Sequence, residues 1–72
     1  MNATVILVPN ERQVRCLKGK ALGKNNREIG EEIGMGTSSV ARELYAIYCM
    51  LGVKNAAAAV AVGMRDGWLR LE

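Results

Sequence analysis

The sequence contains no histidine and no phenylalanine, and these absences argue against several function classes. Histidine is the commonest acid/base side chain and the commonest metal ligand, so we expect no metal site. No nucleophile with a nearby base, paired carboxylates or phosphate-cradling loop can be assembled from the remaining residues, so we expect neither an enzyme nor a bound cofactor. Trp68, Tyr45 and Tyr48 are the only aromatic residues, which is too few for a surface that stacks bases on rings.

Cysteine and long hydrophobic runs are also scarce. Cys16 and Cys49 are far apart in the sequence and form no Cys-x-x-Cys pair, which fits neither a zinc site nor a disulfide-dense secreted scaffold. The apolar run over residues 3–8 is too short to cross a bilayer and has no basic segment before it. We therefore expect a soluble, cytoplasmic protein with no membrane partner.

The length of 72 residues and the net charge of +3 predict one small, mildly basic domain. A chain of this size buries only about 60 % of the surface that its unfolded form exposes, so it can build one modest core. We expect a complete, stand-alone protein over residues 1–72.

The first half of the chain predicts two helices joined by a polar loop. Pro9 precedes a charged stretch, and proline at a helix start leaves no interior hydrogen bond unmade, so a first helix is expected there. A Gly-Lys-Asn-Asn loop ends it. Residues 27–33 form a short second helix, which Asn25 or Asn26 caps.

The second half predicts two more helices. Residues 34–36, Gly-Met-Gly, form a tight turn, and a third helix begins near Thr37, where hydroxyl side chains can bond to its free amides. Gly52 ends this helix, and Asn55 caps an alanine-rich fourth helix over about residues 55–66. Helical spacing predicts a common core of Leu17, Ile29, Ile33, Val40, Leu44, Ile47, Leu51 and Val60.

The sequence predicts two helices joined by a glycine turn over about residues 26–51. This is the helix-turn-helix pattern, in which the second helix enters the DNA major groove. Gly30 supplies a small residue where the two helices approach, and Val40 is an apolar plug at the start of the second. The alternative is a generic helical hairpin whose glycines are connectors. The predicted architecture is all-α, with an extended lead-in over residues 1–8.

These residues resemble the LuxR/GerE-type helix-turn-helix domain. Residues 7–14 resemble the family's Leu-Thr-x-Arg-Glu start, and residues 26–35 its Asn-Lys-Glu-Ile-Ala segment with the following Leu-x-Ile. Recognition-helix and closing-helix positions are matched by Ser39, Val40, Ile47, Leu51, Val53, Asn55, Ala59 and Val60. The resemblance extends from about Leu7 to Met64. It implies four helices, the middle pair reading DNA and the last often pairing two copies.

The chain departs from this family pattern in three places. It carries two extra residues between Val14 and Asn26. Ala41 stands where the family usually has lysine, and Glu43 stands where it often has histidine. The last two changes remove a positive charge and add a negative one beside the groove. Glu43 can pair with a neighbouring arginine, accept a hydrogen bond from cytosine, or remain solvated.

The outward face of the recognition helix supplies the candidate base-reading residues: Arg42, Tyr45, Ala41 and Ser38. Arg42 offers a guanidinium for a bidentate contact to guanine, and Tyr45 a phenol within reach of a base or phosphate. Positive charge and the helix start supply the candidate phosphate-binding residues: Lys24, Asn26, Arg27, Thr37, Ser39 and Lys54.

The last helix supplies a candidate dimer interface. If Ala56, Val60, Gly63 and Met64 turn to the core, the opposite face presents small residues that let two helices approach closely: Ala58, Ala61, Val62 and Arg65. The alternative is an ordinary alanine-rich surface helix.

Taken together, the sequence predicts a small, sequence-specific transcription regulator that binds double-stranded DNA as a homodimer and lacks a sensor domain. The alternative is a protein of the same fold that binds and inhibits another transcription regulator without reading DNA. Ala41 and Glu43 are the features that favour this alternative.

Overall fold

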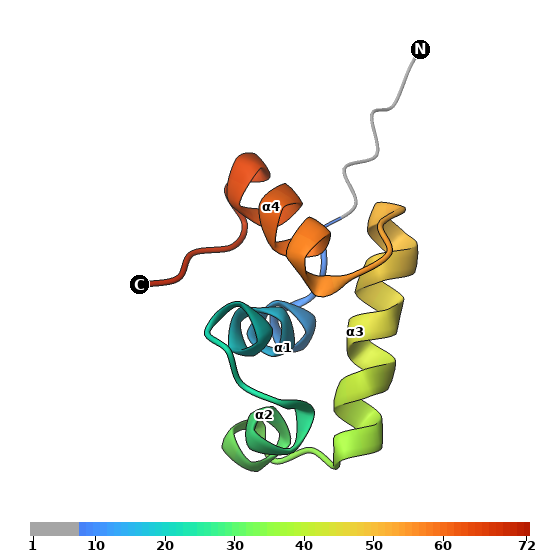
Figure 1. Cartoon of the computed structure of the whole chain (residues 1–72), viewed down its shortest axis with the longest axis vertical. Coiled ribbons are helices and arrows are strands. Elements are labelled where there is room, and N and C mark those ends of the chain that lie inside the picture. The colour runs from blue at the N-terminus through green and yellow to red at the C-terminus, as the bar shows by residue number, and fades with distance from the viewer. Residues whose placement is uncertain (1–7) are drawn as a thin grey trace.

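Four helices form the structure, a computed structural model that describes residues 8–72 (Figure 1). They are α1 (Glu11–Ala21), α2 (Asn26–Ile33), α3 (Thr37–Leu51) and α4 (Ala56–Asp66). These residues contain no strand, so the all-α prediction is confirmed for the described part of the chain. The expected lead-in over residues 1–8 lies outside the described residues except for Val8.

Asparagine side chains set the start of three helices. The Asn10 side chain accepts a hydrogen bond from the Gln13 amide at 2.9 Å, and the Gln13 side chain accepts one from the Asn10 amide at 3.0 Å. Asn25 and Glu28 form the same reciprocal pair, and Asn55 accepts from the amide three residues later. These bonds satisfy N–H groups that have no partner inside the helix, so each start is encoded locally.

The start of α3 differs from what the sequence predicted. Gly36 occupies the N-cap position, and no side chain caps the helix. Thr37, Ser38 and Ser39 follow the cap and lie in the first helical turn. The expected capping by their hydroxyls is therefore wrong, because a capping side chain normally comes from the N-cap residue itself.

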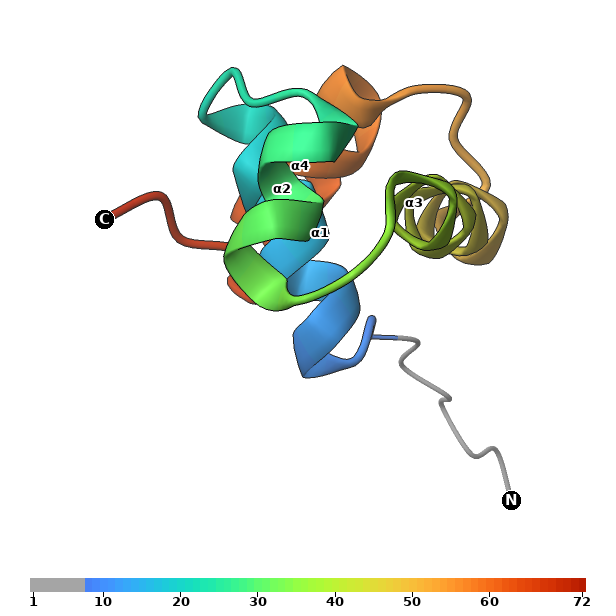
Figure 2. The same ribbon diagram turned by 90° about the horizontal axis from the view of Figure 1, so that it is seen from below.

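Helices α1 and α3 form the centre of the bundle. Each of them packs against all the other helices, whereas α2 and α4 do not contact each other. Figure 1 shows α4 and α2 at opposite ends of the α1–α3 pair. Seen from below in Figure 2, α3 stands at one side of the molecule with the other helices together on its inner side.

The core contains most of the predicted residues and some that were not predicted. Five of the eight expected side chains are buried: Leu17, Ile29, Val40, Leu44 and Ile47. Ile33, Leu51 and Val60 are half-buried and pack against the edge of this cluster. Cys16, Ala59 and Leu69 complete it.

The segment after α4 folds back onto that helix and explains why Leu69 is buried. The Gly63 carbonyl accepts hydrogen bonds from the amides of Gly67, Trp68 and Leu69 at 3.0–3.1 Å. A Cβ atom at Gly63 would lie 2.7 Å from the Leu69 Cβ, so only glycine allows this close return. Met64, expected in the core, is 53 % exposed, because Ala59 and Gly63 form the buried side of α4.

No single helix among residues 8–72 has both the length and the apolar composition to cross a membrane. Only α3 and α4 taken together have that length and composition, and the two helices are bent by 61° relative to each other.

Candidate nucleic-acid interface

The turn between α2 and α3 is built around Gly30. The Met35 amide donates a 2.8 Å hydrogen bond to the Gly30 carbonyl, which folds the turn back onto α2. A Cβ atom at Gly30 would lie 2.3 Å from the Met35 carbonyl oxygen and 3.5 Å from a Val40 methyl group. Gly34 ends α2 in the left-handed region with φ of 74°, which glycine adopts without strain. This turn fixes the direction in which α3 leaves α2.

The outward face of α3 brings the four candidate base-reading residues together. Ser38, Ala41, Arg42 and Tyr45 are all exposed, and the Tyr45 side chain is 69 % exposed. Arg42 forms no ion pair within the described residues, since the three ion pairs there involve other side chains. Cys49, one turn beyond Tyr45, is exposed on the same face. The opposite side of α3 is buried, so the core holds this face outward.

Glu43 does not lie on this face. Its side chain is half-buried, and Oε1 accepts a hydrogen bond from Gln13 Nε2 of α1 at 3.3 Å. Burial raises the pKa of the Cys16 thiol, and the nearby negative charge of Glu43 raises it further. Glu43 therefore contacts α1, and its partner is a glutamine, which none of the three interpretations from sequence included.

The candidate phosphate-binding residues are distributed over several parts of the surface. Thr37 and Ser39 lie in the first turn of α3, exposed and half-buried respectively, and Lys54 is exposed between α3 and α4. Because no side chain caps α3, the amides at its start are available to an outside acceptor.

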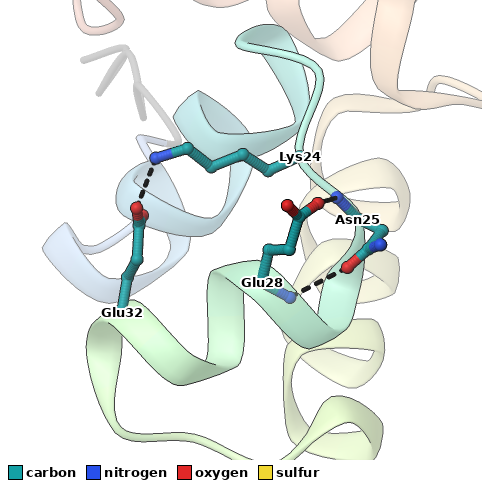
Figure 3. A network of polar contacts seen from close by, with 4 residues as sticks. All are labelled: Lys24, Asn25, Glu28 and Glu32. Carbon is teal, nitrogen blue, oxygen red and sulfur yellow. Dashed lines mark hydrogen bonds and ion pairs between the residues drawn. The ribbon is translucent and has the colours of Figure 1, made fainter.

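Near the start of α2, two of the candidate cations are paired with glutamates. Arg27 Nε lies 3.6 Å from Glu31 Oε2, and both side chains are well exposed. Lys24 pairs with Glu32, and its side chain extends away from α3 (Figure 3). Asn26 is half-buried, and its Oδ1 is buried without a hydrogen-bond partner. Lys24 thus lies apart from the outward face of α3.

The predicted dimer residues occupy one flank of α4. Ala61 and Arg65 are exposed, whereas Ala58 and Val62 are half-buried. Arg65 Nε donates to Asp66 Oδ1 at 2.9 Å, and this bond raises the pKa of the guanidinium. The four residues are therefore only partly available to a second copy.

Sequence reasoning missed one feature of the surface, a hollow between α1 and α2. It is bordered by Arg15 and Lys18 of α1 and by Leu22, the C-cap residue of that helix, which recur three and four residues apart. That spacing is the signal that could have identified them as one surface, because residues three and four apart share a helix face.

Comparisons with protein-family models, with curated proteins and with solved structures found no match for this chain.

Proposed function

We propose that this chain is a small, sequence-specific DNA-binding transcription regulator of the LuxR/GerE type, which reads the major groove with α3. The observation that carries the proposal is the outward face of α3, where Arg42 and Tyr45 are exposed while Val40, Leu44 and Ile47 anchor the same helix in the core. A base-reading helix needs this combination of free polar groups and rigid support.

The dimensions and chemistry of α3 suit the groove. Its 15 residues make it about 22 Å long at 1.5 Å per residue, and the major groove is about 12 Å wide and admits an α-helix. Among the described residues, Arg42 forms no ion pair that DNA would have to break. Its guanidinium can therefore donate two hydrogen bonds to O6 and N7 of guanine. Tyr45, about one turn later, reaches a neighbouring base edge or phosphate.

Contacts to phosphates would set the position of α3 without reading sequence. The uncapped amides at the start of α3, with the Thr37 and Ser39 hydroxyls, suit one phosphate. Lys54, between α3 and α4, and Arg27, in the first turn of α2, supply positive charge, and breaking the exposed Arg27–Glu31 pair costs little in water. Lys24 contributes least to this proposal because it extends away from α3.

We further propose that the protein acts in the cytoplasm as a homodimer that pairs through the exposed flank of α4. Two copies related by a two-fold axis would present two recognition helices to a palindromic site.

One set of observations favours a second function, the binding and inhibition of another transcription regulator. Ala41 is exposed and uncharged, and Lys24 and Arg27 are both paired with glutamates, which leaves fewer free cations around α3. The position of Glu43 against α1 weakens this alternative, because its carboxylate is not on the groove face.

Selection of binding sites from random duplex DNA, followed by titrations at several salt concentrations, separates the two functions. A DNA reader enriches one sequence. Arg42→Ala then weakens binding to that sequence by about 1–3 kcal/mol and relaxes preference mainly at one base pair. Lys54→Ala weakens binding to all sequences alike and lowers the salt slope by about one unit.

Arg70→Ala is the matched control for these variants. Arg70 is an exposed cation in the C-terminal segment, which lies on the other side of the molecule from α3 (Figure 1). The Arg70→Ala substitution removes one positive charge, as Arg42→Ala and Lys54→Ala do, and leaves the base preference unchanged. If the wild-type protein enriches no sequence, the DNA-reading proposal is wrong.

A further inference from the structure

A hollow of about 220 Å³ lies between α1, the following loop and α2, outside the proposed DNA-reading face. It is lined by Arg15, Lys18, Gly19, Leu22, Lys24, Glu32 and Ile33. Two of these residues, Lys24 and Glu32, are drawn in Figure 3, where their ion pair lies on the side of α2 away from α3. A duplex seated on the outward face of α3 therefore does not cover this hollow.

The cations in the hollow are not neutralised equally. Glu32 pairs with Lys24, so the one carboxylate there is already occupied. Arg15 is exposed and forms no ion pair in the described part of the chain. Lys18 donates a 3.3 Å hydrogen bond to the main-chain oxygen of Glu72, but it too has no acidic side chain as partner. The hollow thus contains two cations without an acidic side chain as partner, and Arg15 is the freer of the two because Lys18 must exchange its bond to Glu72 for a new one.

The hollow also has an apolar part of its lining, formed by Leu22 and Ile33. Leu22, the residue that caps the C-terminal end of α1, is a large apolar side chain that is 49 % exposed. Ile33, at the end of α2, is half-buried against the core edge and also lines the hollow. Covering these two side chains removes apolar surface from water, which favours a ligand with an apolar group of its own.

We propose that this hollow is a docking site for an acidic segment of a partner protein, with a large apolar side chain next to its carboxylates. The carboxylates pair with Arg15 and Lys18, and the apolar side chain packs on Leu22 and Ile33. Apolar contact in the centre with complementary charge at the rim is the usual composition of a protein–protein interface.

A nucleic-acid backbone fits the same surface less well. Phosphodiester groups offer nothing apolar to cover Leu22 and Ile33. A peptide can space its carboxylates to meet Arg15 and Lys18 only. This inference goes beyond the proposed function, and it holds whether or not α3 reads DNA.

The test is selection of random short peptides, displayed on phage, against the full-length wild-type protein. The expected result is enrichment of peptides with Asp or Glu adjacent to Leu, Ile, Phe or Trp. For a synthetic copy of an enriched peptide, Arg15→Glu combined with Lys18→Glu lowers affinity by about tenfold or more, since attraction becomes repulsion. Leu22→Ser, at an exposed position, also weakens binding while far-UV circular dichroism is unchanged.

Two controls make the result specific. Lys54→Glu reverses a single charge outside the hollow and leaves peptide affinity unchanged. Arg42→Ala weakens binding to the selected DNA and leaves peptide affinity unchanged, so the failure of one proposal can be told from the failure of the other. The inference is overturned if no acidic and apolar consensus is enriched. It is also overturned if Leu22→Ser has no effect and random duplex DNA displaces the peptide, because the hollow is then a general polyanion surface.

Discussion

At the scale of single residues, Arg42 and Glu43 are neighbours in the sequence but lie on different sides of α3. Arg42 is exposed on the outward face, whereas Glu43 receives a hydrogen bond from Gln13 of α1. A step of about 100° per residue separates adjacent side chains on a helix, so neighbouring charges need not act on the same partner. The negative charge of Glu43 therefore counts less against the proposed DNA binding than it would on the outward face.

Cys49 provides a residue-scale test of whether α3 enters DNA. Its thiol is exposed seven residues after Arg42 and on the same face, whereas Cys16 is fully buried. We expect alkylation of Cys49 to slow when the selected duplex is added, because the groove covers this face. Mass spectrometry of the alkylated protein measures the modification at each site.

Cys16 serves as the internal control in that experiment. Burial raises its pKa and keeps it as the less reactive thiol, so it stays unmodified with or without DNA. Equal alkylation of Cys49 in the presence and absence of the selected duplex would argue against groove insertion of α3.

At the scale of elements, the turn between α2 and α3 sets the geometry of the candidate site. Gly30 lets the Met35 carbonyl approach α2, and Val40 packs beside it from the first turns of α3. Gly36 occupies the N-cap but has open space around its Cα and an ordinary φ of −72°. The two glycines therefore have different physical roles: Gly30, inside α2, lets the turn approach, whereas Gly36 belongs to the turn itself.

Gly30→Ala tests this difference. Its methyl group would lie 2.3 Å from a backbone oxygen, so the turn must shift, and we expect a loss of about 1–3 kcal/mol in the free energy of unfolding. Gly36→Ala adds the same methyl group in open space and costs less than about 1 kcal/mol. Urea unfolding followed by circular dichroism measures both. Equal losses would show that close approach at Gly30 is not the cause.

At the scale of the whole molecule, the C-terminal segment completes the core. Its return over Gly63 places Leu69, only 3 % exposed, against the helices, while Leu71 remains 37 % exposed. In a domain this small, one added leucine is a sizeable part of the core.

Leu69→Ala should therefore destabilise the protein by about 2–5 kcal/mol, the range for a buried leucine replaced by alanine. Leu71→Ala, two residues later, should change the unfolding free energy by less than about 1 kcal/mol because that side chain is partly solvated. Thermal and urea unfolding of the two variants provide the comparison. A Leu69 variant as stable as the wild type would contradict the docked position of the segment.

The proposed homodimer is the second whole-molecule prediction. Ala61 is exposed on the α4 flank, so Ala61→Glu should turn the dimer into a monomer by placing like charges together at the two-fold axis. Sedimentation velocity measures the state, and Leu22→Glu is the control because it adds the same charge on another face. A wild-type protein that sediments as a monomer, alone and on DNA, would exclude this interface.

The sequence by itself determined where the helices begin and end. Asn10, Asn25 and Asn55 cap with amides three residues away, and Gly34 and Gly52 end helices in left-handed conformations. These bonds and dihedral angles involve only near neighbours, so they can be deduced from the order of residues. The stripe on α3 was predictable for the same reason, and with it the outward position of Arg42 and Tyr45.

Only the tertiary structure decided which groups from distant parts of the chain meet. Gln13 of α1 donates a hydrogen bond to Glu43 of α3, and Ala59 is buried in preference to Val60. Helical periodicity indicates which face of each helix is apolar. It does not determine the rotation of the helix about its axis to within one residue, and so does not tell which of two adjacent residues is buried. That rotation depends on the packing of all four helices and the returning C-terminal segment, which no local pattern encodes.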